Sequence, residues 1–278
     1  MRLTGRKWTF VMKITLRKSW DDSCKVSAAG EHEAVLAWAG EYMPGDYFVI
    51  EGLIPGHFYD ITIDAGVGPA LVWAAKEEVR YTIPFYEKKR GHNPLAFVGN
   101  RHYTRVREAD DFELGYRNLA VNPMDLPEAD GLYPHASANI ETRGEAVFAA
   151  RNAIDGVCAT DSHGEWPYAS WGINRNPKAC LKLEFGRPVD IDEIRLYTRA
   201  DFPHDSWWTE GTFTFSDGEK LTVHMDKKIS EPHVFKNIGR KGITWLTLDE
   251  LKKADDPSPF PALTQIEVYG TEGGKSAE

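Results

Sequence analysis

Apolar and polar residues alternate along short segments of the second half of the chain. In 180–185, Leu181 and Leu183 share one face of an extended strand, and Lys182 and Glu184 share the other. A period of two residues is typical of a strand with one buried face. The same reasoning predicts further strands at 191–197, 212–215, 220–224, 243–248 and 265–269.

The first half of the chain shows shorter apolar stretches between turn residues. Pro-Gly and Gly-Pro pairs separate these stretches, as expected in an all-β region. Strands are predicted at 47–51, 59–64, 71–74, 80–85, 102–106 and 111–116. Residues 31–40 are an exception, because the segment between Gly30 and Gly40 is compatible with a helix of two turns.

The spacing of strands and turns predicts the fold class. Asp217 and Gly218 separate two strands as in a β-hairpin. Residues 122–134 indicate a loop, because they include three prolines and three acidic residues. Short strands at near-regular spacing favour β-sandwiches. We therefore predict an all-β protein with a smaller N-terminal β-sandwich over 1–116 and a second sandwich over 117–278. A single elaborated β-domain is the alternative.

Length and charge narrow the possible partners. The chain has 278 residues, which agrees with two domains of roughly 150 residues each. Its formal net charge of −9 repels phosphate, so nucleic acid is not an expected partner. No apolar run reaches the ~18 residues of a membrane span. No signal segment is visible either, so we expect no membrane partner and a cytoplasmic location, or secretion if a signal has been removed. The three cysteines include no CxxC pair and do not indicate a disulfide framework or a zinc ribbon.

Four short motifs occur in a fixed order in the second half. They are Asn-Leu-Ala at 118–120, ARNAIDGVCAT at 150–160, Ser-Asp-Gly at 216–218 and LTQIEVYG at 263–270. With these motifs, residues 117–270 resemble the galactose-binding-like superfamily, which includes discoidin and coagulation-factor C-type domains and many bacterial carbohydrate-binding modules. The resemblance implies that the C-terminal sandwich is a discoidin-like jelly roll.

The motif at 150–160 resembles the loop that wraps a structural calcium ion in this superfamily. The resemblance implies a ligand set of side-chain and backbone oxygens: Asn152, Asp155, Val157, Thr160, Thr264 and Gln265. The family usually has a Glu where this chain has Gln265. Because calcium favours charged oxygen ligands, the lost charge predicts weak calcium binding, or sodium or water in its place. The alternative is that Asp155 only caps backbone amides of an Asp-Gly turn.

Two loops of the second half, 163–175 and 199–208, are rich in aromatic, Arg and His residues. A sugar site needs flat apolar faces together with groups that read hydroxyls. The predicted ligand contacts are His163, Trp166, Tyr168, Arg175, Arg199, Asp201, His204 and Trp208. Arg199 is the strongest candidate, because Tyr197-Thr198-Arg199 resembles the strand end from which an Arg contacts sugar in carbohydrate-binding members.

Some of these residues have an alternative role in packing. Trp171 and Trp207 are expected in the core, because each leads into a predicted strand. Arg199 could instead form an ion pair with Asp201 or Glu165.

Sequence motifs for catalysis do not occur. The GxSxG, HExxH and P-loop patterns are absent from the sequence. The leading prediction is a non-catalytic carbohydrate-binding protein that recognises a glycan through loops at one end of the C-terminal jelly roll. One alternative is a glycan hydrolase with a site between the two halves, where the polar clusters 90–93 and 100–102 could take part. A protein–protein adaptor is another alternative.

Overall fold

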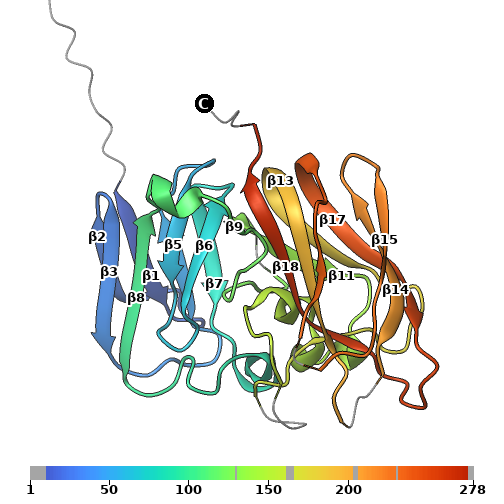
Figure 1. Ribbon diagram of the computed structural model, residues 1–278. Helices are drawn as coiled ribbons and strands as arrows, with labels where there is room; N and C mark the ends of the chain where they lie inside the picture. Colours follow the sequence, from blue (N-terminus) through green and yellow to red (C-terminus); the bar gives the residue numbers. More distant parts are fainter. Residues whose placement is uncertain (1–10, 129, 161–165, 203–205, 230, 275–278) are drawn as a thin grey trace, which may run out of the picture.

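The computed structural model describes residues 11–128, 130–160, 166–202, 206–229 and 231–274. Over these ranges the regular structure consists of antiparallel strands and five short 3-10 helices (Figure 1). The all-β prediction is therefore confirmed. Figure 1 shows two groups of strands side by side, with the N-terminal half in blue and cyan and the C-terminal half in yellow to red. None of the described helices is long and apolar enough to span a membrane.

The N-terminal half is a sandwich of two sheets. The first contains, in spatial order, β2 (Cys24–Gly30), β1 (Met12–Arg17), β4 (Tyr47–Glu51) and β7 (Glu78–Thr82). The second contains β10 (Leu132–Tyr133), β6 (Pro69–Ala74), β5 (Phe58–Thr62), β8 (Arg101–Glu108) and β3 (Glu33–Ala39). One hydrophobic core includes Ile14 and Phe48 from the first sheet and Ile61 and Val72 from the second.

Two segments of this half differ from their predicted structure. The segment compatible with a helix is strand β3, because Ala34 and Leu36 are buried with the exposed Val35 between them, and the strand pairs along β8. The predicted strand at 111–116 contains the 3-10 helix η2 (Asp111–Leu114). The Glu113 carboxylate there binds the Arg107 guanidinium through two hydrogen bonds of 2.6 and 2.7 Å, which curls the chain back on β8.

The C-terminal half is built on three long strands of 19, 14 and 11 residues. The spatial order is β12 (Trp171–Gly172), β18 (Ala262–Glu272), β13 (Leu181–Arg199), β17 (Arg240–Lys253), β14 (Trp208–Phe215) and β15 (Lys220–His224). Three short strands join at the sides: β9 (Arg117–Asn118), β11 (His135–Ala138) and β16 (His233–Phe235). The predicted hairpin is β14–β15, with Gly218 at φ 88° in its turn.

Strand β13 bends and changes partners along its length. Its first part pairs with β11 and β17, its last part pairs with β16 and β18, and its register with β17 shifts between Glu184 and Val189. Gly186 lies in the bend at φ 71°, and a Cβ atom there would meet the Tyr133 ring at 2.4 Å. The bend lets one strand contribute to both sides of a single core, which includes Phe185 and Leu196.

The two halves are joined by a shared segment and by direct contacts. The shared segment runs from β9 to β10. It begins in the C-terminal sheet, where β9 pairs with β18, and then returns to the N-terminal half, where Met124 and Leu126 pack in the core and β10 extends a sheet. The predicted loop at 122–134 is thus irregular except for β10. Across the junction, the buried Arg151 guanidinium donates to the Gly91 carbonyl at 3.0 Å.

Candidate functional site

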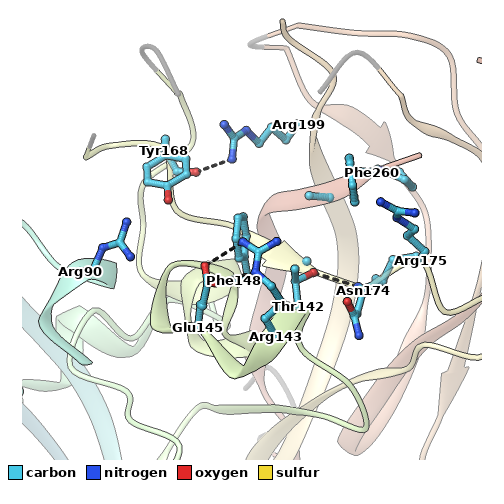
Figure 2. Close-up of a pocket in the computed structure, with 14 residues that line it drawn as sticks. Arg90, Thr142, Arg143, Glu145, Phe148, Tyr168, Asn174, Arg175, Arg199 and Phe260 are labelled. Carbon is cyan, nitrogen blue, oxygen red and sulfur yellow. Dashed lines mark hydrogen bonds and ion pairs between the residues drawn. The ribbon is translucent and has the colours of Figure 1, made fainter. Parts of the chain in front are cut away.

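A pocket of about 260 Å³ opens at one end of the C-terminal sandwich. Its floor and walls come from the short helices η3 (Thr142–Gly144) and η4 (Ala146–Phe148), from β12, and from the chain at the start of β18 and the end of β13. Arg90, from the helix η1 (Tyr86–Gly91) of the N-terminal half, completes one side (Figure 2). Both halves therefore contribute to this pocket.

Three aromatic side chains line the pocket, and each faces a guanidinium group. Arg199 lies 4.9 Å from the centre of the Tyr168 ring, and Arg175 lies 4.4 Å from that of Phe260. Arg143 lies 5.5 Å from the centre of the Phe148 ring. Such cation–π pairs help to hold the guanidinium groups in place beside the rings. The pocket thus combines flat apolar faces with fork-shaped donors.

Arg199 is the most deeply buried of these cations. Only 2% of its surface is exposed, and its Nη1 donates to the Tyr168 carbonyl at 3.0 Å. Its Nε lies 3.5 Å from Oδ1 of Asp201, whose other oxygen accepts a hydrogen bond from the Thr160 hydroxyl. Burial lowers the pKa of the Arg199 guanidinium, and the Asp201 carboxylate opposes that shift. Arg199 therefore forms one wall of the pocket and also fixes the chain around Tyr168.

Arg175, unlike Arg199, is not buried. It is exposed at the pocket rim, and both it and Asn174 adopt left-handed backbone conformations, at φ 57° and 49°. The turn is held by the Asn174 N–H, which donates to the Thr142 hydroxyl at 2.9 Å. A left-handed Arg costs backbone energy that the surroundings must offset, and such residues cluster at functional sites. The strain places Arg175 over Phe260 at the entrance (Figure 2).

Charge in the pocket is predominantly positive. Arg90, Arg143, Arg175 and Arg199 line it, and Glu145 is the one carboxylate among the described lining residues. That carboxylate binds Arg143 through two hydrogen bonds, at 2.6 and 2.9 Å, so its charge is already matched. The pocket therefore carries an excess of guanidinium groups.

The structure places the predicted ligand residues in different surroundings. Tyr168, Arg175 and Arg199 line the pocket, and Asp201 supports Arg199 from behind. Trp166 is 37% exposed and lies outside the pocket, beside the junction of the two halves. His163 and His204 fall outside the described residues.

The two adjacent tryptophans differ from the roles predicted for them. Trp208, a predicted ligand platform, is 1% exposed and packs 6.4 Å from the Trp171 ring in the core. Trp207, predicted to be in the core with Trp171, is half-buried beneath the Lys227 ammonium group. Trp208 begins β14 on its inward face, so it cannot present its ring to a sugar.

Several pocket residues were not identified from the sequence. Phe148 and Phe260 supply two of the three aromatic faces, and Arg143 supplies a donor. Phe260 stands between two prolines, in Ser258-Pro259-Phe260-Pro261. An aromatic residue fixed between prolines is a usable local signal, whereas nothing local distinguishes Phe148 from a core residue.

The predicted calcium loop at 150–160 contacts β18, the strand that carries the other two predicted ligands, Thr264 and Gln265. The Gly156 N–H donates to Oε1 of Gln265 at 3.3 Å. The β13–β18 register shifts between Tyr197 and Thr198, which leaves Thr264 in a bulge. Burial raises the pKa of the Asp155 carboxyl to about 7, and the Arg151 charge opposes this shift. The loop therefore holds one half-buried carboxyl group next to β18.

The side-chain oxygens of this loop only partly fit a cation. Oδ1 of Asp155 accepts a hydrogen bond from the Val157 N–H at 2.8 Å, and the Thr160 hydroxyl is directed at Asp201. The Asn152 side-chain amide donates to the Ala146 carbonyl at 2.8 Å. Within the described ranges, no three His, Cys, Asp or Glu side chains gather as a metal-binding group. A cation here would rely mainly on carbonyls, on the second Asp155 oxygen and on water.

Comparison with known proteins finds sugar-binding modules. Chitosan-binding module 1 of a chitosanase/glucanase from Paenibacillus sp. IK-5 is 16% identical, with 55% of this chain and 99% of that chain covered and a TM-score of 0.39. A Streptococcus pneumoniae fucose-binding module is 15% identical, with 56% and 99% covered and a TM-score of 0.40. A Clostridium perfringens module in complex with GalNAc-β-1,3-galactose is 17% identical, with 49% and 94% covered and a TM-score of 0.37.

A family model also matches part of the chain. The model described as Domain of unknown function (DUF7402) matches residues 132–254. No curated protein matches the chain. The similar solved structures belong to the group of sugar-binding modules that the sequence motifs resemble.

Proposed function

We propose that this protein binds a carbohydrate, and that one sugar ring enters the pocket at the end of the C-terminal sandwich. The observation that carries the proposal is the set of three aromatic–guanidinium pairs around one cavity. Sites for drug-sized ligands have volumes of about 300–1,000 Å³. A cavity of about 260 Å³ therefore suits a smaller ligand, such as a single sugar ring.

Each part of the pocket has a role in this proposal. The half-buried Phe260 offers a face for the C–H side of a sugar ring, and Arg175 beside it reads a pair of neighbouring hydroxyls. Arg199 holds the wall formed by Tyr168 and is a positioning residue as well as a contact. This revises the expectation that Arg199 is the leading exposed contact. Arg175 takes that place.

Binding accounts for the pocket better than hydrolysis does. Glycosidases of the common type need two carboxyl groups on either side of the scissile bond. Among the described residues that line the pocket, the one carboxylate, Glu145, is held by Arg143. The proposed function is therefore recognition without chemistry.

Calorimetric titration with oligosaccharides tests this proposal. Arg175→Ala removes an exposed guanidinium stacked on Phe260. Arg80→Ala is a matched control, because Arg80 is also exposed and stacks on an aromatic ring, that of Tyr47, but does not line the pocket. Loss of a hydrogen bond from a charged group costs about 1.5–3 kcal/mol, so Arg175→Ala is expected to weaken binding about tenfold or more. Equal weakening by both variants, or by neither, would place the sugar elsewhere.

We propose separately that the loop at 152–160 holds calcium weakly. Support comes from the half-buried Asp155 carboxyl and from the bulge at Thr264, which frees a carbonyl from the regular ladder. Calcium is expected to raise the thermal midpoint of the wild type relative to a chelator, and Asp155→Asn is expected to abolish that difference. If calcium and chelator give the same midpoint for the wild type, the loop is an Asp-Gly turn without a cation.

A further inference from the structure

A second hollow of about 300 Å³ adjoins the sugar pocket at the junction of the two halves. Its walls include Tyr86, Lys89 and Arg90 from η1 and Trp166 and Tyr168 from the C-terminal half. Arg90 and Tyr168 also line the sugar pocket. Because two residues are common to both walls, the pocket and the hollow are neighbouring parts of one surface depression, which we name the junction groove.

The helix η1 is fixed against the C-terminal half. The Glu87 carboxylate accepts a hydrogen bond from the Ala146 N–H at 2.8 Å, and the Gly91 carbonyl accepts one from Arg151 at 3.0 Å. A Cβ atom on Gly91 would lie 2.7 Å from the Ala146 carbonyl oxygen, so the two backbones meet closely. Arg90 is therefore held beside the pocket by the contacts on both sides of it, and is not at the end of a free loop.

The junction groove carries an excess of positive charge, even though Arg143 is paired with Glu145 and Arg199 with Asp201. Lys89 adds a cation to the four arginines of the pocket, and no acidic residue among the described ones lines the second hollow. In the part of the chain that the structure describes, Arg175 stacks on Phe260 and has no carboxylate within ion-pair distance, and Arg90 acts on the Glu145 carboxylate only as a nearby charge, behind Arg143. The whole chain carries a net charge of −9. A local excess of guanidinium groups in an acidic protein indicates a ligand with negative charge.

The second hollow also presents aromatic rings to solvent. Tyr86 is 78% exposed and Trp166 is 37% exposed. Tyr86 adopts φ 53°, a conformation that bulky residues rarely take. The strained backbone places a large ring at the surface, where it gains little from burial. A role in contacting a ligand accounts for both the ring and the strain.

We propose that the junction groove binds an acidic oligosaccharide, whose sugar units carry carboxylate or sulfate groups. This inference rests on the proposed function and extends it: one unit occupies the pocket, and the next units cross Arg90 and Tyr168 to reach Trp166 and Tyr86. The N-terminal half then serves as part of the binding site through η1. Arg90 and Lys89 recognise the acidic groups, while the aromatic rings stack on the sugar faces.

Titration of the full chain at low and physiological salt tests the inference. The probes are a galacturonic acid tetramer, its fully methyl-esterified form, a neutral galactose tetramer, a sulfated galactose tetramer and oligo-dT. At least one acidic tetramer is expected to bind tenfold or more tightly than the neutral forms, and added salt is expected to reduce that preference. The carboxylated and sulfated probes distinguish the two sources of charge.

Two variants on the same helix locate the effect. Arg90→Gln is expected to weaken binding of the acidic tetramer about tenfold more than it weakens binding of the neutral tetramer. Lys88→Gln is the control, because Lys88 pairs with Glu128 and does not line the junction groove. Equal affinities for acidic and neutral tetramers, or an unchanged preference in Arg90→Gln, overturn the inference but leave the proposed function intact. Absence of binding to every sugar overturns both, and tighter binding of oligo-dT than of any sugar also overturns the inference.

Discussion

The junction groove requires the two halves to keep a fixed relative position, and a buried ion cluster next to the bend of β13 contributes to this. Glu272 accepts two hydrogen bonds from Arg187, at 2.7 and 2.8 Å, and it also binds Arg117. The Arg187 guanidinium lies 4.5 Å from the centre of the Phe58 ring in the N-terminal half. The three charged side chains are only 8–16% exposed. The change that tests this cluster is Glu272→Gln.

The expected effect is large because two buried cations share one anion. Removing one partner of a buried ion pair costs about 3–5 kcal/mol, chiefly because the remaining charge is left uncompensated. Glutamine keeps the size of the side chain and one acceptor, so we expect a loss of about 3 kcal/mol in the free energy of unfolding. Urea unfolding followed by tryptophan fluorescence measures this loss. Asp130→Asn, in an exposed pair with Lys76, is the control and is expected to change stability by less than about 1 kcal/mol.

The pH dependence gives an independent test of the same cluster. Burial alone would raise the pKa of Glu272, but Arg187 and Arg117 outweigh it and hold the pKa below its usual value of 4.5. A lowered pKa in the folded state means that the stabilisation is present above pH 4.5 and is lost as the pH falls below it. The difference between wild type and Glu272→Gln is therefore expected to be constant above about pH 5.5 and to shrink in acid. A difference below 1 kcal/mol at pH 7, or one that does not shrink, would refute this reasoning.

Three further changes are expected to have separable effects in urea unfolding and in titration. Trp208→Ala removes a core side chain and is expected to cost about 3–5 kcal/mol of stability; a small loss would mean that this ring is not in the core. Gly91→Ala forces apart two backbones that meet at Ala146, so we expect a loss of about 1–3 kcal/mol together with weaker sugar binding. Arg199→Ala leaves the Tyr168 carbonyl without its buried donor and is expected to cost about 1–3 kcal/mol. Arg175→Ala, at an exposed position, is the comparison for Arg199→Ala and is expected to keep a stability within about 0.5 kcal/mol of the wild type. Equal losses of stability in Arg175→Ala and Arg199→Ala would contradict the difference in burial between the two arginines.

The fold was predictable where one strand face is buried and the other is solvated. Leu181 and Leu183 are fully buried in β13, as their alternation with charged residues predicts. The failure at 33–39 has a physical cause. Ala and Leu favour helices in isolation, but the segment gains more by burying Ala34 and Leu36 in the core while it pairs with β8. Non-local pairing of this kind leaves no local signal.

The site was predictable only in part, for a related reason. Tyr168, Arg175 and Arg199 were identified because they stand in loops rich in aromatic and charged residues. The error between Trp207 and Trp208 follows from the period of two in a strand, because a shift of one residue exchanges the inward and outward faces. Loop residues before β14 give no sign of where the alternation begins, so adjacent tryptophans could not be told apart.

Net charge is the property for which sequence and structure lead to different expectations. The total of −9 describes the field far from the molecule, and that field disfavours long polyanions, which must lie across much of the surface. Close to the surface, charges more than about 8 Å apart are largely screened at physiological salt, so the groups nearest a ligand dominate. Arg90, Arg143, Arg175 and Arg199 are dispersed along the sequence, and only the fold brings them to one pocket. For this reason the ligand that we propose is a short acidic oligosaccharide and not a nucleic acid.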